Sequence, residues 1–180
     1  FKREFLGYFR SPVAYVFLIV FLMAAVGLSF FLGQFFDSGE ASLERFFVFH
    51  PWLFLFLIPA VGMRLWSEEK RTGTIELLFT LPLTTTAAVF GKFIAAWAFL
   101  TCAIGLTLPM AFTVGYLGDP DWGIIAASYV GSILMAGAYL GVCSLTSALT
   151  KNQVISFVLS VVVCLVLVFL GWSVFSEVLE

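Results

Sequence analysis

Five long apolar stretches restrict the fold of this chain more than any other feature of its sequence. Bilayer hydrocarbon is about 30 Å thick, so a helix that spans it needs about 20 mostly apolar residues. The stretches that meet this need lie at about 13–32, 46–65, 87–117, 122–149 and 154–175. Their apolar runs are continuous rather than alternating, which argues against the strands of a membrane barrel. The sequence therefore predicts an all-α protein, a polytopic bundle of transmembrane helices.

Composition agrees that lipid surrounds most of the chain. The sequence is 62% hydrophobic and 11% charged, whereas a soluble domain is about 45–50% apolar and about 25% charged. A soluble fold of 180 residues could not bury so much apolar surface. The net charge of −2 gives no strong electrostatic basis for binding nucleic acid. Membrane lipid is thus an expected partner, and nucleic acid is not.

Basic residues are distributed unevenly among the loops. Three precede the first apolar stretch, four surround the loop after the second, and one lies in the turn after the fourth, while Arg45 is the exception. Short loops rich in Lys and Arg remain in the cytoplasm, so we expect the N-terminus to be cytoplasmic. The residues on that side are Lys2, Arg3, Arg10, Arg64, Lys70, Arg71, Lys92 and Lys151.

Two segments refine this arrangement. Residues 1–11 place Phe1, Phe5, Tyr8 and Phe9 on one helical face, which predicts a helix lying in the cytoplasmic interface; the alternative is a frayed start of the first span. In the fourth stretch, Gly137 and Gly141 are four residues apart. Small residues at this spacing let helix backbones approach closely, and packing within the chain is favoured over a dimer contact.

Residues suited to catalysis are scarce. The single histidine, His50, has no paired carboxylate or cysteine nearby in sequence and is interpreted as an interfacial side chain. The sequence contains no zinc-protease, hydrolase or phosphate-loop motif. No Asp or Glu lies in the middle of an apolar stretch, although ion-coupled carriers generally need such groups. The sequence therefore predicts no catalytic, cofactor or metal site, and it argues against a self-powered secondary transporter.

The segment at 64–86 carries the most information about function. A charged cluster at 68–71 is followed by a turn at Thr72-Gly73, and Thr74 is a plausible N-cap for a short helix. That helix would expose Ile75, Leu77, Leu78, Phe79 and Leu81 before Pro82 limits it. Exposed apolar surfaces of this kind usually mark a contact with another protein. The alternative is a loop folded back onto the lipid headgroups.

Residues 64–93 resemble the first cytoplasmic loop of ABC-type-2 permeases. In that family a Glu-rich start leads to Gly-Thr-x-Glu-x-Leu, then a Pro, then a Gly-Lys that opens the third span. The chain supplies matching residues at each step: Glu68, Glu69, Gly73-Thr74-Ile75-Glu76-Leu77-Leu78, Pro82 and Gly91-Lys92. The most similar branch comprises permeases of gliding-motility and nitrous-oxide-maturation systems. The interfacial N-terminal helix and the acidic outer loops extend the resemblance over most of the chain.

The resemblance implies a function and a set of partners. In the family this loop forms a coupling helix that docks in a cleft of a separate ATP-binding subunit, and two permeases, alike or related, pair with two ATPases. The chain would then be one permease domain over 1–180, the bacterial inner-membrane half of an ATP-driven transporter, usually an exporter. ATP and Mg would be bound by the partner, and an accessory membrane or periplasmic protein can complete such systems. The implied coupling residues are Glu68, Glu69, Gly73, Thr74, Glu76, Leu77 and Leu78.

One departure from the family is visible. Family members have six spans, whereas the sequence contains five apolar stretches. We expect the natural protein to continue for a further apolar stretch of about 20 residues that returns to the cytoplasm. A different class of function also fits the docking loop: a membrane scaffold that anchors a cytoplasmic ATPase without moving a substrate.

Overall fold

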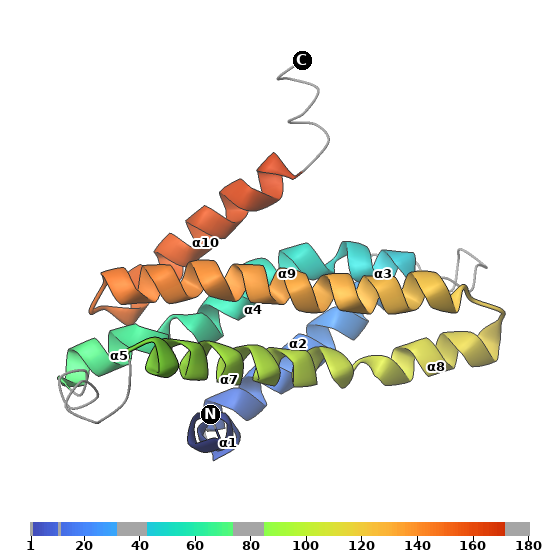
Figure 1. Cartoon of the computed structure of the whole chain (residues 1–180). Coiled ribbons are helices and arrows are strands. Elements are labelled where there is room, and N and C mark those ends of the chain that lie inside the picture. Colours follow the sequence, from blue (N-terminus) through green and yellow to red (C-terminus); the bar gives the residue numbers. More distant parts are fainter. Residues whose placement is uncertain (1, 11, 32–42, 74–84, 172–180) are drawn as a thin grey trace. The chain divides into compact units, whose positions relative to one another are not determined.

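The computed structural model describes residues 2–10, 12–31, 43–73 and 85–171. Within these ranges every regular element is an α-helix (Figure 1), which confirms the predicted all-α membrane bundle. No element between α5 and α7 is described, because residues 74–84 lie outside the described ranges. The helices are α1 (Lys2–Arg10), α2 (Pro12–Phe31), α3 (Glu44–Val48), α4 (His50–Gly62), α5 (Arg64–Thr72), α7 (Thr85–Gly105), α8 (Leu108–Leu117), α9 (Trp122–Leu149) and α10 (Gln153–Leu170).

Three helical segments among the described residues are long and apolar enough to cross a bilayer: Thr86–Leu117, Trp122–Leu149 and Gln153–Leu170. A shorter apolar helix covers Ala14–Ser29. The stretch predicted at 46–65 is divided among α3, α4 and α5. Pro59 lies inside α4 and removes one backbone donor from that helix. The count of five spans therefore stays a prediction.

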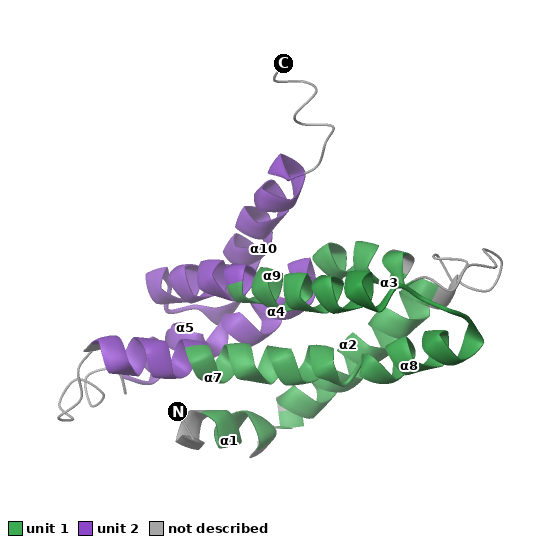
Figure 2. Ribbon diagram, turned by 45° about the vertical axis from the view of Figure 1, so that its right-hand side comes forward, with its two compact units in different colours: residues 1–53, 94–137 green, residues 54–93, 138–180 purple. Residues whose placement is uncertain are grey.

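Two compact units can be distinguished in the chain (Figure 2). Unit 1 contains residues 1–53 and 94–137, and unit 2 contains residues 54–93 and 138–180. The boundaries fall inside α4, α7 and α9, so each of these helices contributes residues to both units. The packing of each unit is described separately below.

An aromatic cluster around Phe99 of α7 organises part of unit 1. Phe99 is fully buried, and its ring centroid lies 5.3 Å from that of Tyr8, 5.6 Å from that of Phe9 and 5.6 Å from that of Phe17. Tyr8 is stacked on Phe99, and Phe9 meets it edge to face, two favourable geometries for aromatic pairs. The cluster holds α1 against α7. Two rings of the face predicted to lie in the membrane interface thus contact another helix.

His50 lies in a second aromatic cluster of unit 1. The side chain is fully buried, and its Nδ1 lies 3.0 Å from the carbonyl oxygen of Phe46. The rings of Phe46 and Phe47 lie 4.7 Å and 5.2 Å from the imidazole. Within the chain the His50 side chain is thus enclosed by aromatic rings, and its interfacial position stays a prediction.

The two glycines predicted to support helix packing differ in their surroundings. In unit 1, a Cβ added to Gly137 would lie 2.9 Å from Nε1 of Trp97, and this indole donates a hydrogen bond of 2.9 Å to the carbonyl oxygen of Ile133. In unit 2, a Cβ added to Gly141 would meet nothing within 4 Å. Of these two glycines, Gly137 is the one at which another helix approaches closely.

Unit 2 is held together by small and polar residues at helix contacts. A Cβ added to Gly62 of α4 would lie 2.4 Å from Cβ of Cys143, so α4 and α9 approach closely there. Thr146 of α9 and Ser160 of α10 share a hydrogen bond of 2.5 Å. Asn152 begins α10 by accepting a hydrogen bond of 2.9 Å from Val154 N, as expected of an N-cap residue.

Candidate functional site

The helix α5 forms the start of the segment singled out by the sequence. Residues 66–72 were expected in a loop, but the structure continues them as helix from Arg64 to Thr72. The reason is that neither Gly nor Pro interrupts the chain from Arg64 until Gly73, whose φ of 72° places it in the left-handed conformation that ends helices. Thr72 supports this last turn by donating a hydrogen bond of 2.9 Å to the carbonyl oxygen of Glu68.

The first turn of α5 is capped by a side chain from α9. Helix N-termini leave backbone N–H groups without partners inside the helix, and Met63 supplies no side-chain cap here. The hydroxyl of Ser147 fills this role: it accepts 3.0 Å hydrogen bonds from the backbone N–H groups of Trp66 and Ser67. Its own proton is donated to the carbonyl oxygen of Met63 at 2.9 Å. Ser147 therefore joins the backbone of α5 to α9.

The end of α9 is capped in return by α5. Lys70 donates from Nζ to the carbonyl oxygen of Ala148, one residue before the last residue of α9. The last carbonyl groups of a helix lack partners inside the helix and carry a partial negative charge, which favours a cation. The two helices thus satisfy each other's unpaired ends.

A third attachment connects α5 to α7 through Lys92. Its Nζ lies 2.5 Å from Oε1 of Glu69 and donates a hydrogen bond of 3.3 Å to the carbonyl oxygen of Leu65. Only 12% of the Lys92 side chain and 23% of the Glu69 side chain are exposed, so solvent screens this ion pair less than a surface pair. The charge of each residue is compensated by the other.

Trp66 supplies two further contacts of α5. Nζ of Lys92 lies 5.4 Å from the centroid of the Trp66 ring, within the range of a cation–π interaction. On the other side the indole Nε1 donates a hydrogen bond of 3.1 Å to Oγ of Ser144. We call the group formed by Trp66, Ser67, Glu69, Lys70, Lys92, Ser144 and Ser147 the α5 junction. Its interactions fix a short charged helix to two long helices within unit 2.

The implied coupling residues lie in and next to this junction. Glu69 belongs to it, Glu68 accepts the hydrogen bond from Thr72 within α5, and Gly73 ends the helix. The other four residues, Thr74, Glu76, Leu77 and Leu78, lie outside the described residues. The structure therefore describes the base of the loop, from which residues 74–84 continue.

Sequence reasoning missed the role of α9 in this site. Ser144, Ser147 and Ala148 are spaced to share one helical face, and this spacing near the helix end is the signal that was available. The partners, however, are about 80 residues away in the chain, at Trp66, Ser67 and Lys70. Such distant pairing is not encoded in a local pattern.

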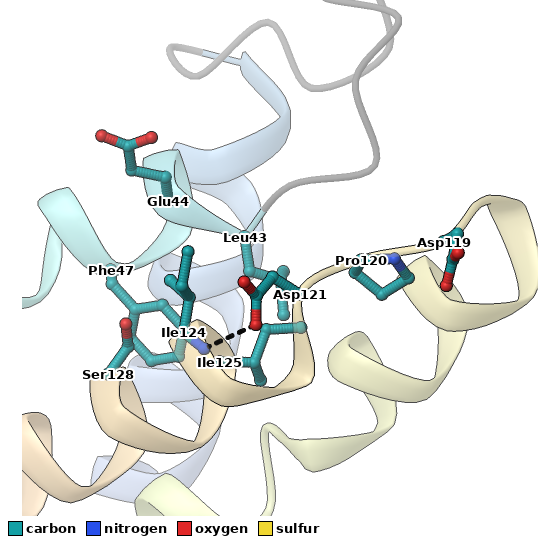
Figure 3. A pocket seen from close by; sticks show the side chains of 9 residues that line it. All are labelled: Leu43, Glu44, Phe47, Asp119, Pro120, Asp121, Ile124, Ile125 and Ser128. Carbon is teal, nitrogen blue, oxygen red and sulfur yellow. Dashed lines mark hydrogen bonds between the residues drawn. The ribbon is translucent and has the colours of Figure 1, made fainter.

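A pocket of about 150 Å³ lies in unit 1 and is the second candidate site (Figure 3). Glu44, Asp119 and Asp121 accompany its apolar lining, but Oδ1 of Asp121 already accepts hydrogen bonds from Gly123 N at 2.8 Å and Ile124 N at 3.2 Å. Across the described ranges, no group of three or more His, Cys, Asp or Glu residues is placed to hold a metal ion. Residues lining the pocket are Leu43, Glu44, Phe47, Asp119, Pro120, Asp121, Ile124, Ile125 and Ser128.

Comparison with known proteins gives one clear result. The family described as ABC-2 family transporter protein matches residues 1–171 of the chain. Searches of curated proteins and of solved structures return no match. The matched region includes every described helix and the whole α5 junction. Together with the long apolar helices, the match identifies a multi-pass membrane protein. The chain belongs to the ABC-2 family of transporter proteins, the permease subunits of ABC transporters, which normally work with an ATP-binding subunit.

Proposed function

We propose that this permease is driven by a separate ATP-binding subunit that docks on the segment 64–86, and that it works as an exporter. The observation that carries the proposal is the α5 junction. The helix that leads directly into residues 74–84 is fixed to α7 by an ion pair of 2.5 Å and to α9 by capping hydrogen bonds. A force applied to the loop would therefore reach the long helices.

The loop itself has the properties of a docking element. A helix of fewer than about 12 residues is marginal in water by itself, and the apolar residues after Gly73 would gain order by entering a cleft. Leu77 and Leu78 would supply the apolar anchors, and Glu76 would meet basic or amide groups at the rim of the cleft. ATP and Mg would be bound by the partner subunit.

We also propose an orientation in the membrane, a set of partners and a branch of the family for this permease. The distribution of basic residues supports a cytoplasmic N-terminus in the bacterial inner membrane. In this orientation the α5 junction would face a cytoplasmic partner. A second copy of this permease or a related permease would complete the transport path, with an accessory membrane or periplasmic protein as a further partner. The loop motif favours the branch of gliding-motility and nitrous-oxide-maturation permeases.

Replacing Leu77 and Leu78 with Asp tests the docking function. Truncating a buried anchor at an interface commonly costs about 2 kcal/mol or more, and a buried carboxylate costs more. We expect the double variant to lose the ATP-binding subunit in a pull-down while the purified permease keeps its thermal unfolding midpoint. The matched control replaces both residues with Met, which keeps the apolar volume. Full retention of the ATP-binding subunit by the double Asp variant would refute docking at this loop.

A labelling experiment tests the proposed orientation. A cysteine introduced in place of Gly39 should react with an impermeant thiol reagent added outside intact cells. A cysteine in place of Thr72, which is exposed at the end of α5, should react only after the membrane is opened. The reverse pattern would overturn the orientation.

The scaffold function predicts a different behaviour of the complex. A scaffold would bind the ATP-binding subunit through the same loop without coupling ATP hydrolysis to transport. Reconstituted vesicles distinguish the two functions, since a transporter should show ATP hydrolysis that a substrate-containing membrane extract stimulates. Hydrolysis that no extract changes would favour the scaffold.

A further inference from the structure

We propose that Ser147 is the positioning residue that carries ATP-dependent movement of α5 to the end of α9. The inference rests on the proposed coupling function and names a residue outside the segment 64–86 through which the coupling passes. The ATP-binding subunit would displace residues 74–84 and with them α5. The hydroxyl of Ser147 would then make α9 follow.

The hydrogen bonding of Ser147 suits this role because it holds backbone rather than side-chain atoms. A hydroxyl has one donor and two acceptor positions, and Ser147 uses all three, on Trp66 N, Ser67 N and Met63 O. Ser147 is fully buried, so water does not compete for these bonds. Its position is therefore tied to the position of the α5 backbone and not to a side-chain rotamer.

A second attachment fixes the orientation of α5 relative to α9. A single contact would act as a pivot about which α5 could turn. Lys70 adds a second contact, to the carbonyl oxygen of Ala148, three residues beyond Ser67 along α5. Three residues of helix correspond to about 4.5 Å along the axis. With contacts at two points, α5 cannot turn without moving the last residues of α9.

Ser144 shows why the role belongs to Ser147. It accepts one hydrogen bond, of 3.1 Å, from the indole Nε1 of Trp66. That bond holds the tip of a side chain and not the α5 backbone itself. Ser144 lies on α9 and contacts α5, as Ser147 does, and it therefore provides a matched position for comparison.

Hydrogen exchange of the complete complex tests the inference. The permease purified with its ATP-binding subunit is compared with and without MgATP and vanadate, which trap the nucleotide-bound state. In the wild type we expect trapping to change amide exchange in residues 74–84 and also in residues 138–149 of α9. In Ser147→Ala the change at 74–84 should remain, and the change at 138–149 should be lost. Ser144→Ala, which removes only a contact with the Trp66 side chain, should weaken the change at 138–149 less than Ser147→Ala does.

Further variants make the result decisive. Ser147→Thr keeps the hydroxyl and should restore the response of α9. Thr113 is exposed, and its hydroxyl donates within its own helix to the carbonyl oxygen of Pro109. Thr113→Ala should therefore behave as wild type. If Ser147→Ala does not assemble, Ser147→Cys serves instead, because a thiol is a weaker acceptor and should weaken the response. A normal α9 response in Ser147→Ala, or an unresponsive α9 in the wild type, would overturn the inference. After either outcome the proposed function would still stand, provided that the variant with Asp at positions 77 and 78 releases the ATP-binding subunit.

Discussion

Two short helices, α1 and α5, are each held against α7, but by different chemistry. In unit 1, α1 is held by Tyr8 and Phe9, whose rings pack on Phe99. In unit 2, α5 is held by the pair of Lys92 with Glu69 and by capping bonds to α9. Apolar contact depends mainly on the area removed from solvent and has little directionality, whereas hydrogen bonds weaken steeply when they are bent. The contrast indicates that α1 is anchored, while α5 is also oriented, as the proposed coupling function requires.

The largest effect is expected from Lys92→Met in the α5 junction. Removing one partner leaves the other charge uncompensated, which costs about 3–5 kcal/mol in a fully buried pair and up to that amount in this largely buried one. We expect the thermal unfolding midpoint of the purified permease to fall, because the charge of Glu69 loses its partner. The control is Lys151→Met, at an exposed lysine in the turn before α10. Adding Glu69→Gln to Lys92→Met should recover part of the stability, and the absence of any recovery would contradict the pairing.

A smaller effect of a different kind is expected from Phe99→Ala in unit 1. Loss of a buried Phe costs about 3 kcal/mol, since it removes packing and leaves a cavity. Hydrogen exchange in α1 should become faster, while α9 should still respond to nucleotide trapping, because the α5 junction is intact. Phe112→Ala, at a side chain that is 68% exposed, should change neither. Loss of the α9 response in Phe99→Ala would break the distinction between anchoring and orienting.

The smallest effect is expected from Ser144→Ala. A single hydrogen bond between membrane helices contributes on average about 0.6 kcal/mol. We expect a shift of the thermal unfolding midpoint that is clearly smaller than the shift in Ser147→Ala, which removes a hydroxyl that accepts from two backbone N–H groups. Equal shifts for the two variants would show that capping of the α5 backbone has no special weight.

The sequence predicted the parts of this molecule that depend on local pattern. Apolar runs of membrane-spanning length predicted the helical class, and the turn at Gly73 followed from the tolerance of glycine for positive φ. The α5 helix was missed because its charges were interpreted as a loop, although no Gly or Pro interrupts it. Ser147 and the burial of His50 were missed because both depend on residues brought together by packing, and no local periodicity reports such contacts.

Photo-cross-linking from position 77 tests the central claim most directly. A benzophenone amino acid replaces Leu77 in the complex of the permease with its ATP-binding subunit, and a second variant carries it at Asp119, an exposed residue of the acidic loop before α9. We predict a covalent adduct with the ATP-binding subunit from position 77 and none from position 119. Adducts from position 77 with lipid or with the permease alone would contradict the claim that this loop is where the ATP-binding subunit docks.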